Sequence, residues 1–440
     1  MGSDAEEMLR ALGLSSVDDL FVDVPAKVRV DRLGLKPGLS EDDVVAYLTS
    51  VLAANRSMAD MPTFLGAGLY DHFVPAAVRA ITSRSEFYTS YTPYQAELSQ
   101  GMLQALWEYQ SLVCELTGMD AANTSMYDGS TALGEAALMA RRIHGGRVFL
   151  VPRTLWWSRK SVLANYAIGG GLQIREVDYD RGTGTLDVGK LKEALSPEVG
   201  GVYVENPNFL GRFEEQLEDI RAATDAVFVV GVNPLAQAVV RPPGDFGADI
   251  VVGEGQPLGS PVNFGGPLLG IFACRQEHVR KMPGRVIGLT KDAKDHRAFC
   301  MTLQTREQHI RREKAMSNIC TNEALLAVAA AAYMSILGAS GLRRVAMENI
   351  RRGKDLAASI ARIPGYEAPL FRGAHFNEFT VRGPKPYERI HEALLARGVH
   401  GGVPLGRHVP ELHDAALFAT TERHRPEDVR RLLEAMEAAA

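Results

Sequence analysis

Short apolar runs recur through the middle of the chain. Several lack the alternation of a half-exposed strand, and six are rich in strand-forming residues: Val148–Val151, Leu172–Val177, Val202–Glu205, Val227–Val232, Ile250–Gly253 and Leu268–Cys274. Parallel strands that are covered by helices on both faces have this continuous pattern. Helical patterns separate many of the runs, so the sequence predicts an α/β fold with right-handed βαβ units and a mostly parallel sheet.

Helical patterns also precede the sheet. Within the first 60 or so residues, SSVDDL and SEDDVVAYLTSVLAAN each begin with Ser and Asp, which suit the first turn of a helix. From Leu98 to Thr117 apolar residues recur at helical spacing, and Gly118 is suited to end that helix. We therefore expect an N-terminal helical arm before the large domain.

The character of the chain changes after Thr302. A charged connector precedes an apolar segment, Ala324–Gly338, which is too short to span a bilayer and predicts a buried helix. The strand-like FNEFTVRG and helices from about Pro386 and from Pro426 follow and suggest a small α+β domain. The predicted division is an N-terminal arm with helices (1–100), a large α/β domain (101–320), and a long helix with the small C-terminal α+β domain (321–440).

The composition of the chain argues against some classes of function. The chain has 440 residues, of which 46% are hydrophobic and 23% charged, as in ordinary globular proteins. Its formal net charge of -5, without a single-sign patch in the sequence, gives no reason to expect nucleic acid. The N-terminal segment MGSDAEEMLRALG lacks the basic-then-apolar layout of a signal peptide. We expect a cytoplasmic protein that does not bind a membrane.

Metal and hydrolase sites have little support in the sequence. The four cysteines are far apart and form no CxxC pair, which argues against a structural zinc site and fits a reducing compartment. The eleven histidines form no HxxxH or HxH cluster, and neither a GxSxG elbow nor a Walker loop occurs. We expect no metal site.

A polar turn precedes a predicted helix that spans Leu133–Ile143. Gly129, Ser130 and Thr131 would present free N–H groups at the positive end of the helix dipole, which suits a phosphate. The alternative is that Asp128 or Ser130 caps the helix and that the turn binds no phosphate. Both interpretations stay open.

Two asparagines follow predicted strands. Asn206 ends one strand, at the sheet edge where open α/β sheets bind ligands, although a plain turn explains it as well. Asn233 ends the next strand, where pyridoxal-phosphate enzymes place the carboxylate partner of the ring nitrogen. An amide cannot keep that nitrogen protonated by electrostatics.

The residues after the predicted strand Ile250–Gly253 lack the primary amine that a Schiff base with pyridoxal phosphate requires. In a pyridoxal-phosphate enzyme of this architecture, the aldimine lysine would follow the strand that ends in Glu254 and Gln256. The chain has no lysine between Lys192 and Lys281, and a Schiff base needs a primary amine. The sequence therefore predicts the fold without the reactive group.

Two further segments are chemically distinctive. Tyr88, Tyr91, Tyr94 and Gln95 lie in a tyrosine-rich stretch that suits an interface or a ligand channel, or else the core packing of an arm. The arginine-rich stretch Thr302–Lys314 predicts a solvated or salt-bridged helix, with an anion or subunit contact as the alternative.

Several stretches together resemble one family. They run in family order from about Phe87 to Phe379 and read FYTSYTPYQAELSQG, LTGMDAANTSMYDGSTALGEA, GADIVVGEGQPLG, FGGPLLGIFA, PGRVIG, TLQTREQHIRREKAMSNICTNEAL and FNEF. The combination resembles the P-protein of the glycine cleavage system, in its N-terminal-half or subunit 1 form. GEGQPLG together with TLQTREQHIRREKA is the most specific part of the match.

The resemblance implies a fold-type-I pyridoxal-phosphate architecture in a two-subunit glycine dehydrogenase (decarboxylating). In that form two copies of this subunit pair with two of subunit 2, which carries the aldimine lysine and the pyridoxal phosphate. The complex decarboxylates glycine and passes the aminomethyl group to the lipoyl arm of the H-protein. Asn233 departs from the family, which commonly has Asp there, and this weakens any claim of cofactor binding by this chain.

By the resemblance, no residue of this chain forms the aldimine. We hypothesise that Tyr88, Tyr91, Tyr94 and Gln95 supply a wall of the substrate and lipoyl channel at the partner interface, because of their aromatic and polar character before the large domain. Vestigial cofactor-pocket positions are Gly129, Ser130, Thr131, Asn206, Asn233, Glu254 and Gln256. Three alternatives stay open: a self-sufficient pyridoxal-phosphate lyase that uses Lys281 or Lys314, a non-catalytic scaffold or regulatory subunit, and a binding protein for another ligand.

Overall fold

The computed structural model describes residues 3–30, 32–263 and 265–440, which form two compact units, Met1–Ser57 and Met58–Ala440. The first unit contains helices α1 (Ser3–Ala11) and α2 (Glu41–Leu52) and the short 3-10 turns η1 (Val17–Phe21) and η2 (Ala26–Val28). Ser40 caps α2 by accepting the Asp43 N–H at 3.2 Å, as the sequence predicts. Met1, Gly2 and Phe264, which belong to stretches quoted above, lie outside the described residues.

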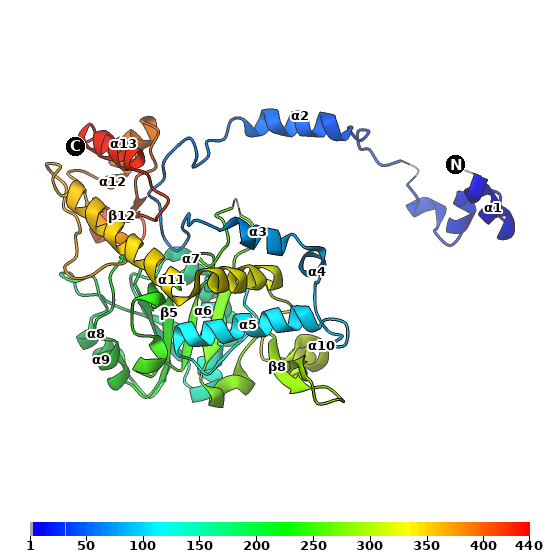
Figure 1. Ribbon diagram of the computed structural model, residues 1–440, viewed down its shortest axis with the longest axis horizontal. Helices are drawn as coiled ribbons and strands as arrows, with labels where there is room; N and C mark the ends of the chain where they lie inside the picture. The colour runs from blue at the N-terminus through cyan, green and yellow to red at the C-terminus, as the bar shows by residue number, and fades with distance from the viewer. Residues whose placement is uncertain (1–2, 31, 264) are drawn as a thin grey trace. The chain divides into compact units, whose positions relative to one another are not determined.

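The second unit is built on a seven-stranded sheet in the order β1-β7-β6-β5-β4-β2-β3. Strand β5 of this sheet is labelled in Figure 1, together with α5 (Gln100–Thr117), α6 (Gly129–His144) and α11 (Ala324–Ile360). The strands are β1 (Ala121–Ala122), β2 (Val148–Pro152), β3 (Gln173–Val177), β4 (Val199–Asn206), β5 (Val227–Val232), β6 (Ile250–Glu254) and β7 (Gly270–Cys274). Strands β6, β5, β4, β2 and β3 are parallel, whereas β7 runs antiparallel to β6 and β1 antiparallel to β7. All six apolar runs are strands, and the mostly parallel sheet is confirmed.

Both faces of the sheet are buried, which explains the continuous apolar runs. In β5, Val227 and Val229 belong to a core cluster with residues of α6 (Gly129–His144). Phe228 and Val230 alternate with them and belong to a second cluster, with residues of α5 (Gln100–Thr117) and α11 (Ala324–Ile360). A strand that packs on both faces has no exposed position for a polar residue.

The remaining helices of the large domain connect or cover these elements. They are α3 (Ala76–Thr82), α4 (Ser85–Tyr88), α7 (Trp157–Gly170), α8 (Val188–Ala194) and α9 (Leu217–Ala222). Helix α5 ends at Gly118, whose left-handed backbone (φ 67°) lets its N–H reach the Cys114 carbonyl. The predicted stop is confirmed, because only glycine adopts this conformation without strain.

Helix α11 is longer than its apolar segment suggested. It continues from Ala324 to Ile360 and breaks at Gly338, which has non-helical φ and ψ of 59° and 179°. By length and composition it is the one helix of the described residues that could cross a membrane, and half of its most apolar stretch is buried. Because α11 packs against α5 and α3, it is a core helix, as predicted.

The C-terminal part of the second unit contains a small antiparallel sheet and two helices. Its antiparallel sheet has the order β10-β12-β11, with β10 at Glu378–Arg382, β12 at Ala415–Ala419 and β11 at Val403–Pro404. Helices α12 (Tyr387–Ala396) and α13 (Pro426–Glu437) pack together against it.

Two features differ from the sequence prediction. A hairpin of β8 (Val286–Lys291) and β9 (Arg297–Thr302), which the apolar pattern did not indicate, packs beside α5. The arginine-rich stretch is not one solvated helix: it contains only α10 (Gln308–Arg311) and two 3-10 turns, η6 (Gln304–Arg306) and η7 (Arg312–Lys314). The reason is that Arg306 turns inward and donates to the Met282, Gly284 and Leu303 carbonyls, which ties the start of the segment to the body, while residues 308–314 are exposed.

Candidate functional site

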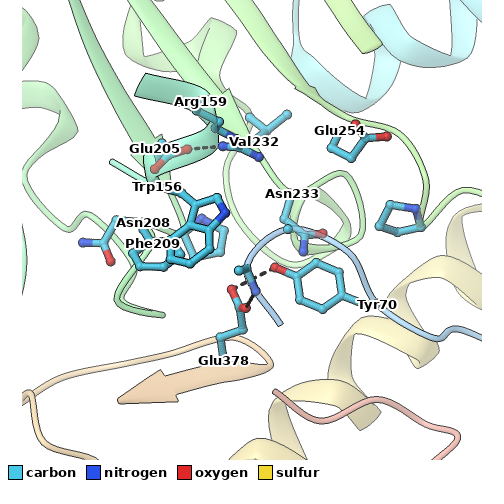
Figure 2. Close-up of a pocket in the computed structure, with 15 residues that line it drawn as sticks. Tyr70, Trp156, Arg159, Glu205, Asn208, Phe209, Val232, Asn233, Glu254 and Glu378 are labelled. Atoms are coloured by element: carbon cyan, nitrogen blue, oxygen red, sulfur yellow. Dashed lines mark hydrogen bonds and ion pairs between the residues drawn. The ribbon is translucent and has the colours of Figure 1, made fainter. Parts of the chain in front are cut away.

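A small pocket of about 40 Å³ lies at the carboxyl ends of the parallel strands (Figure 2). It is lined from the sheet, from the loop before α7, from α7, from residues 67–70 and from β10. The lining residues are Ala67, Gly68, Tyr70, Trp156, Arg159, Glu205, Pro207, Asn208, Phe209, Gly231, Val232, Asn233, Glu254, Pro257 and Glu378. This is the edge at which open α/β sheets bind their ligands.

Glu254 closes the amino end of helix α6. Its Oε2 accepts the N–H of Gly129 at 2.9 Å, while its Oε1 accepts the N–H groups of Gln256 and Leu269 at 3.0 and 3.1 Å. Burial raises the pKa of this carboxyl to about 7, although the three backbone N–H groups act in the opposite direction. A side chain of the protein itself therefore fills the anion position that the helix start offers.

Gln256 is tied to the arm segment and has no exposed surface. Its Oε1 accepts the Tyr70 N–H at 3.0 Å, and its Nε2 donates to the carbonyls of Tyr70 and Ser260 at 2.9 and 2.7 Å. The amide thus pairs with Tyr70 as a neighbouring strand would. An aldimine lysine at this position could not make the same contacts, because an ammonium group accepts no hydrogen bond.

An ion pair lines one wall of the pocket. Arg159 of α7 binds Glu205 (Figure 2). Glu205 also accepts the Tyr203 hydroxyl at 3.1 Å. On the opposite wall, Glu378 accepts the Ala67 N–H at 2.6 Å and the Tyr70 hydroxyl at 2.8 Å. Burial raises the pKa of Glu378 to about 7. Residues 67–70 thereby link Gln256, which follows β6, to β10 of the three-stranded sheet.

The asparagines and the helix start serve local structure. Asn233 lines the pocket, but its Oδ1 accepts the Leu235 N–H at 3.0 Å and so caps a turn. Asn206 is buried and its Oδ1 accepts the Glu214 N–H at 3.1 Å, outside the pocket lining. Asp128 caps α6 through the Thr131 N–H at 2.7 Å, as the capping interpretation expected. Ser130 is half-buried in the first turn and does not line the pocket.

The residues of this pocket do not fit pyridoxal phosphate. The N–H of Gly129 is taken by Glu254, the Arg159–Glu205 ion pair lines the pocket, and about 40 Å³ holds only a few water molecules. Among the described residues no lysine lines the pocket. Lys281, one alternative aldimine lysine, instead donates to the Arg142 carbonyl at 3.0 Å.

The tyrosine-rich segment lies apart from the pocket and at the surface. The side chains of Tyr88, Tyr91 and Tyr94 are 71%, 74% and 50% exposed, and Gln95 is exposed beside them. Large apolar rings at such exposure suit a protein interface better than a monomer surface. The core-packing alternative is wrong for these three tyrosines.

Sequence reasoning missed part of the pocket. Arg159, Glu378 and Tyr70 come from three distant segments, and nothing in their local sequence marks them as neighbours. No local signal marked Arg159 either, because it lies inside α7 and not at the end of β2, which is Pro152. Among the described residues, no group of three His, Cys, Asp or Glu side chains is placed to hold a metal ion.

Comparisons with known proteins identify the relatives of this chain. A family model described as "Glycine cleavage system P-protein" matches residues 1–436. A protein of Pyrococcus abyssi named "Probable glycine dehydrogenase (decarboxylating) subunit 1" is 50% identical, over 98% of this chain and 96% of its own length. A protein of the same name from Desulfitobacterium hafniense is 45% identical, over 98% of this chain and 97% of its own length.

Solved structures with a similar fold identify the architecture of this chain. The crystal structure of a glycine decarboxylase (P-protein) of the glycine cleavage system, in inhibitor-bound form, has a TM-score of 0.92 and 40% identity and covers 100% of this chain and 99% of its own. A Lactobacillus brevis glutamate decarboxylase, with a TM-score of 0.69 and 10% identity, covers 94% and 95% and shows the fold alone. The architecture is that of fold-type-I pyridoxal-phosphate enzymes.

Proposed function

The chain belongs to the glycine cleavage system P-protein family, and we propose that it is the subunit of a two-subunit glycine dehydrogenase (decarboxylating) that holds no cofactor of its own. The observation that carries this proposal is the Glu254 carboxylate at the start of α6, together with the absence of a lysine from Lys192 to Lys281. Subunit 2 would supply the pyridoxal phosphate and its lysine. The complex would decarboxylate glycine and transfer the aminomethyl group to the lipoyl arm of the H-protein.

The tyrosine-rich segment would form part of the channel at the subunit interface. Tyr88, Tyr91, Tyr94 and Gln95 offer large rings and polar groups at an exposed surface. Aromatic walls exclude water, and water would protonate the carbanion equivalent before it reached the lipoyl sulfur. A role for the channel in productive transfer follows from this chemistry.

The assembly and location that we propose follow the same family. Two copies of this chain would pair with two of subunit 2, and the working complex would bind glycine and lipoylated H-protein, without nucleic acid or membrane. The four cysteines are free in the structure, and burial raises the pKa of Cys114 and Cys274 to about 12. Free thiols of this kind suit the reducing cytoplasm.

The decisive experiment mixes this chain with a lysine-bearing subunit 2. Glycine-dependent CO2 exchange with lipoylated H-protein should appear only in the mixture, while the chain alone should show neither activity nor borohydride-fixed pyridoxal phosphate by mass spectrometry. Cofactor fixed covalently on the isolated chain would favour a self-sufficient enzyme. Full exchange by subunit 2 alone would leave this chain only a scaffold or regulatory role.

Tyrosine variants separate a channel from a scaffold. In the reconstituted complex, Tyr94→Ala should lower turnover while subunit 2 still binds. If the alanine variants of Tyr88, Tyr91, Tyr94 and Gln95 all keep wild-type kinetics, the channel assignment fails and the subunit assignment stands.

A further inference from the structure

Arg285 is a buried guanidinium that joins three distant segments of the chain. It lies directly before β8, and its side chain is only 7% exposed. One terminal nitrogen, Nη1, donates to the hydroxyls of Thr92 and Thr321 at 3.2 and 3.1 Å. The other, Nη2, donates to the Cys320 carbonyl at 2.8 Å and to the Tyr94 hydroxyl at 3.2 Å. These hydrogen bonds fix the position of the buried Arg285 guanidinium.

The loop that carries Arg285 is itself held from both sides. Gly284 has a φ of +75°, and a Cβ there would meet the Asn123 side chain at 2.7 Å. Asn123 donates to the Pro283 carbonyl at 3.1 Å, and Arg306 donates to the Gly284 carbonyl at 3.0 Å. The guanidinium therefore projects from a rigid turn towards the tyrosine-rich segment.

One carboxylate, that of Glu307, pairs with Arg285 without a hydrogen bond. The nearest carboxylate, Glu307, approaches Nε only to 3.8 Å, which is beyond hydrogen-bond distance, and this buried Nε has no hydrogen-bond partner. His309 lies 3.6 Å from the same carboxylate and its ring meets the Tyr94 ring edge-on at 6.0 Å. The Arg285 guanidinium also lies 5.5 Å from the centre of the Tyr94 ring.

The hydrogen bond from Arg285 fixes the orientation of the Tyr94 hydroxyl. This hydroxyl accepts a charge-assisted hydrogen bond from Arg285, and none of the described residues accepts its own proton. Since a phenol that accepts from a cation becomes a better donor, the free O–H presents a polarised hydrogen to whatever covers this half-exposed ring.

We propose that Arg285 is a positioning residue that holds the Tyr94 hydroxyl as a hydrogen-bond donor towards the partner subunit's active site. The acceptor is an anionic oxygen or sulfur atom of the reacting groups or of the partner. This inference rests on the proposed function, because it needs Tyr94 at the subunit interface. It gives the Tyr94 hydroxyl a chemical role in addition to the part that the tyrosine-rich segment plays as a wall of the channel.

The test is a double-mutant cycle in the reconstituted complex. Tyr94→Phe removes the hydroxyl and keeps the ring, and Arg285→Met removes the guanidinium and keeps the packing volume. Each should lower kcat about tenfold with little change in the KM for H-protein or the affinity for subunit 2. The double variant should also be about tenfold slower, not a hundredfold, because both changes remove the same interaction.

A matched control is Arg275→Met. Arg275 also donates to backbone carbonyls, those of Ala248 and Gly244, but within the described part of the chain its side chain makes no hydrogen bond to the segments that Arg285 joins. It should keep wild-type kcat even if the variant loses stability. Arg285→Lys, which retains one cation but cannot hold Tyr94 and Thr92 together, should have an intermediate kcat and replaces Arg285→Met in the cycle if that variant does not fold.

Each other outcome has a defined meaning. Additive losses, or an Arg285 variant that loses affinity for subunit 2 instead of kcat, would overturn the positioning role. Wild-type kcat in Tyr94→Phe would overturn the donor role. In both cases the unmodified chain still restores exchange, so the proposed function stands; only failure of the unmodified chain to do so would refute that function.

Discussion

Glu254 and Gly129 meet where helix α6 starts, with the Glu254 Oε2 accepting the Gly129 N–H at 2.9 Å. The positive end of a helix attracts anions, and here the anion is a side chain from the end of β6. A carboxyl group of the chain itself therefore takes the Gly129 N–H that the sequence analysis offered to a phosphate.

Removing that carboxylate should expose a latent anion site. Glu254→Ala leaves the N–H groups of Gly129, Gln256 and Leu269 buried without an acceptor, which should cost about 2–4 kcal/mol of unfolding free energy. Inorganic phosphate should then raise the Tm of the variant more than that of the wild type. Glu254→Gln, which keeps an acceptor oxygen, is the control. Equal phosphate responses in all three proteins would show that the helix start is not an anion site.

A lysine restored by mutation should not restore cofactor binding. In Gln256→Lys the Tyr70 N–H loses its acceptor and an ammonium group enters a fully buried position, so stability should fall by about 3–5 kcal/mol. Glu254 still fills the helix start. Mass spectrometry after borohydride should find no pyridoxal adduct, with Gln256→Met as the stability control. A stoichiometric adduct on the new lysine would contradict the view that the pocket is closed.

Much of the fold could be predicted because its signals are local. The apolar run Val227–Val232 has the bounds of β5, since burial on both faces excludes polar residues throughout the strand. The β8–β9 hairpin escaped prediction because Leu289, Thr290 and Lys291 are exposed, so the continuous apolar pattern of a buried strand breaks off there. Its existence depends on packing beside α5, which no short window of sequence contains.

Of the candidate site, the sequence predicted the missing lysine but not the contacts that fill the pocket. The missing lysine is visible in the sequence, and the strand-end positions of Glu254 and Gln256 follow from the strand pattern. What fills the pocket was not visible: Glu254 reaches Gly129 across 125 positions, and Tyr70 meets Glu378 across 308. Such pairs arise from the tertiary fold, and their residue types are ordinary in isolation.

The break in α11 should depend on one glycine. Gly338 has φ 59° and ψ 179°, a region essentially reserved for glycine, while a Cβ there would meet no atom within 4 Å. Gly338→Ala should therefore cost about 1–3 kcal/mol through backbone strain alone, measured by denaturant unfolding. Gly169→Ala, in a helix and equally free of clashes, should instead be neutral or stabilising. Equal effects of the two substitutions would mean that α11 can straighten at no cost.

The two domains should become less tightly coupled as the pH rises, because Glu378 links them. Burial raises the pKa of Glu378 to about 7 from an ordinary value of 4.5. The folded chain therefore takes up a proton between those values: the contribution of the protonated carboxyl is fully present below about pH 4.5 and is lost as the pH rises through about 7. The loss amounts to about 3 kcal/mol at most.

Glu378→Gln should remove this dependence and keep the geometry. A glutamine oxygen still accepts the Ala67 N–H, and its NH2 group can donate to the Tyr70 oxygen, which rotates its own hydrogen away. The variant should match the wild type near pH 5 and be more stable above pH 7, so that a plot of Tm against pH is flatter. Glu193→Gln, an exposed substitution on α8, should keep the wild-type slope. If Glu378→Gln lowers stability equally at all pH values, the carboxyl is ionised in the folded chain throughout, and its ion-like contacts with residues 67–70 stabilise the domain junction.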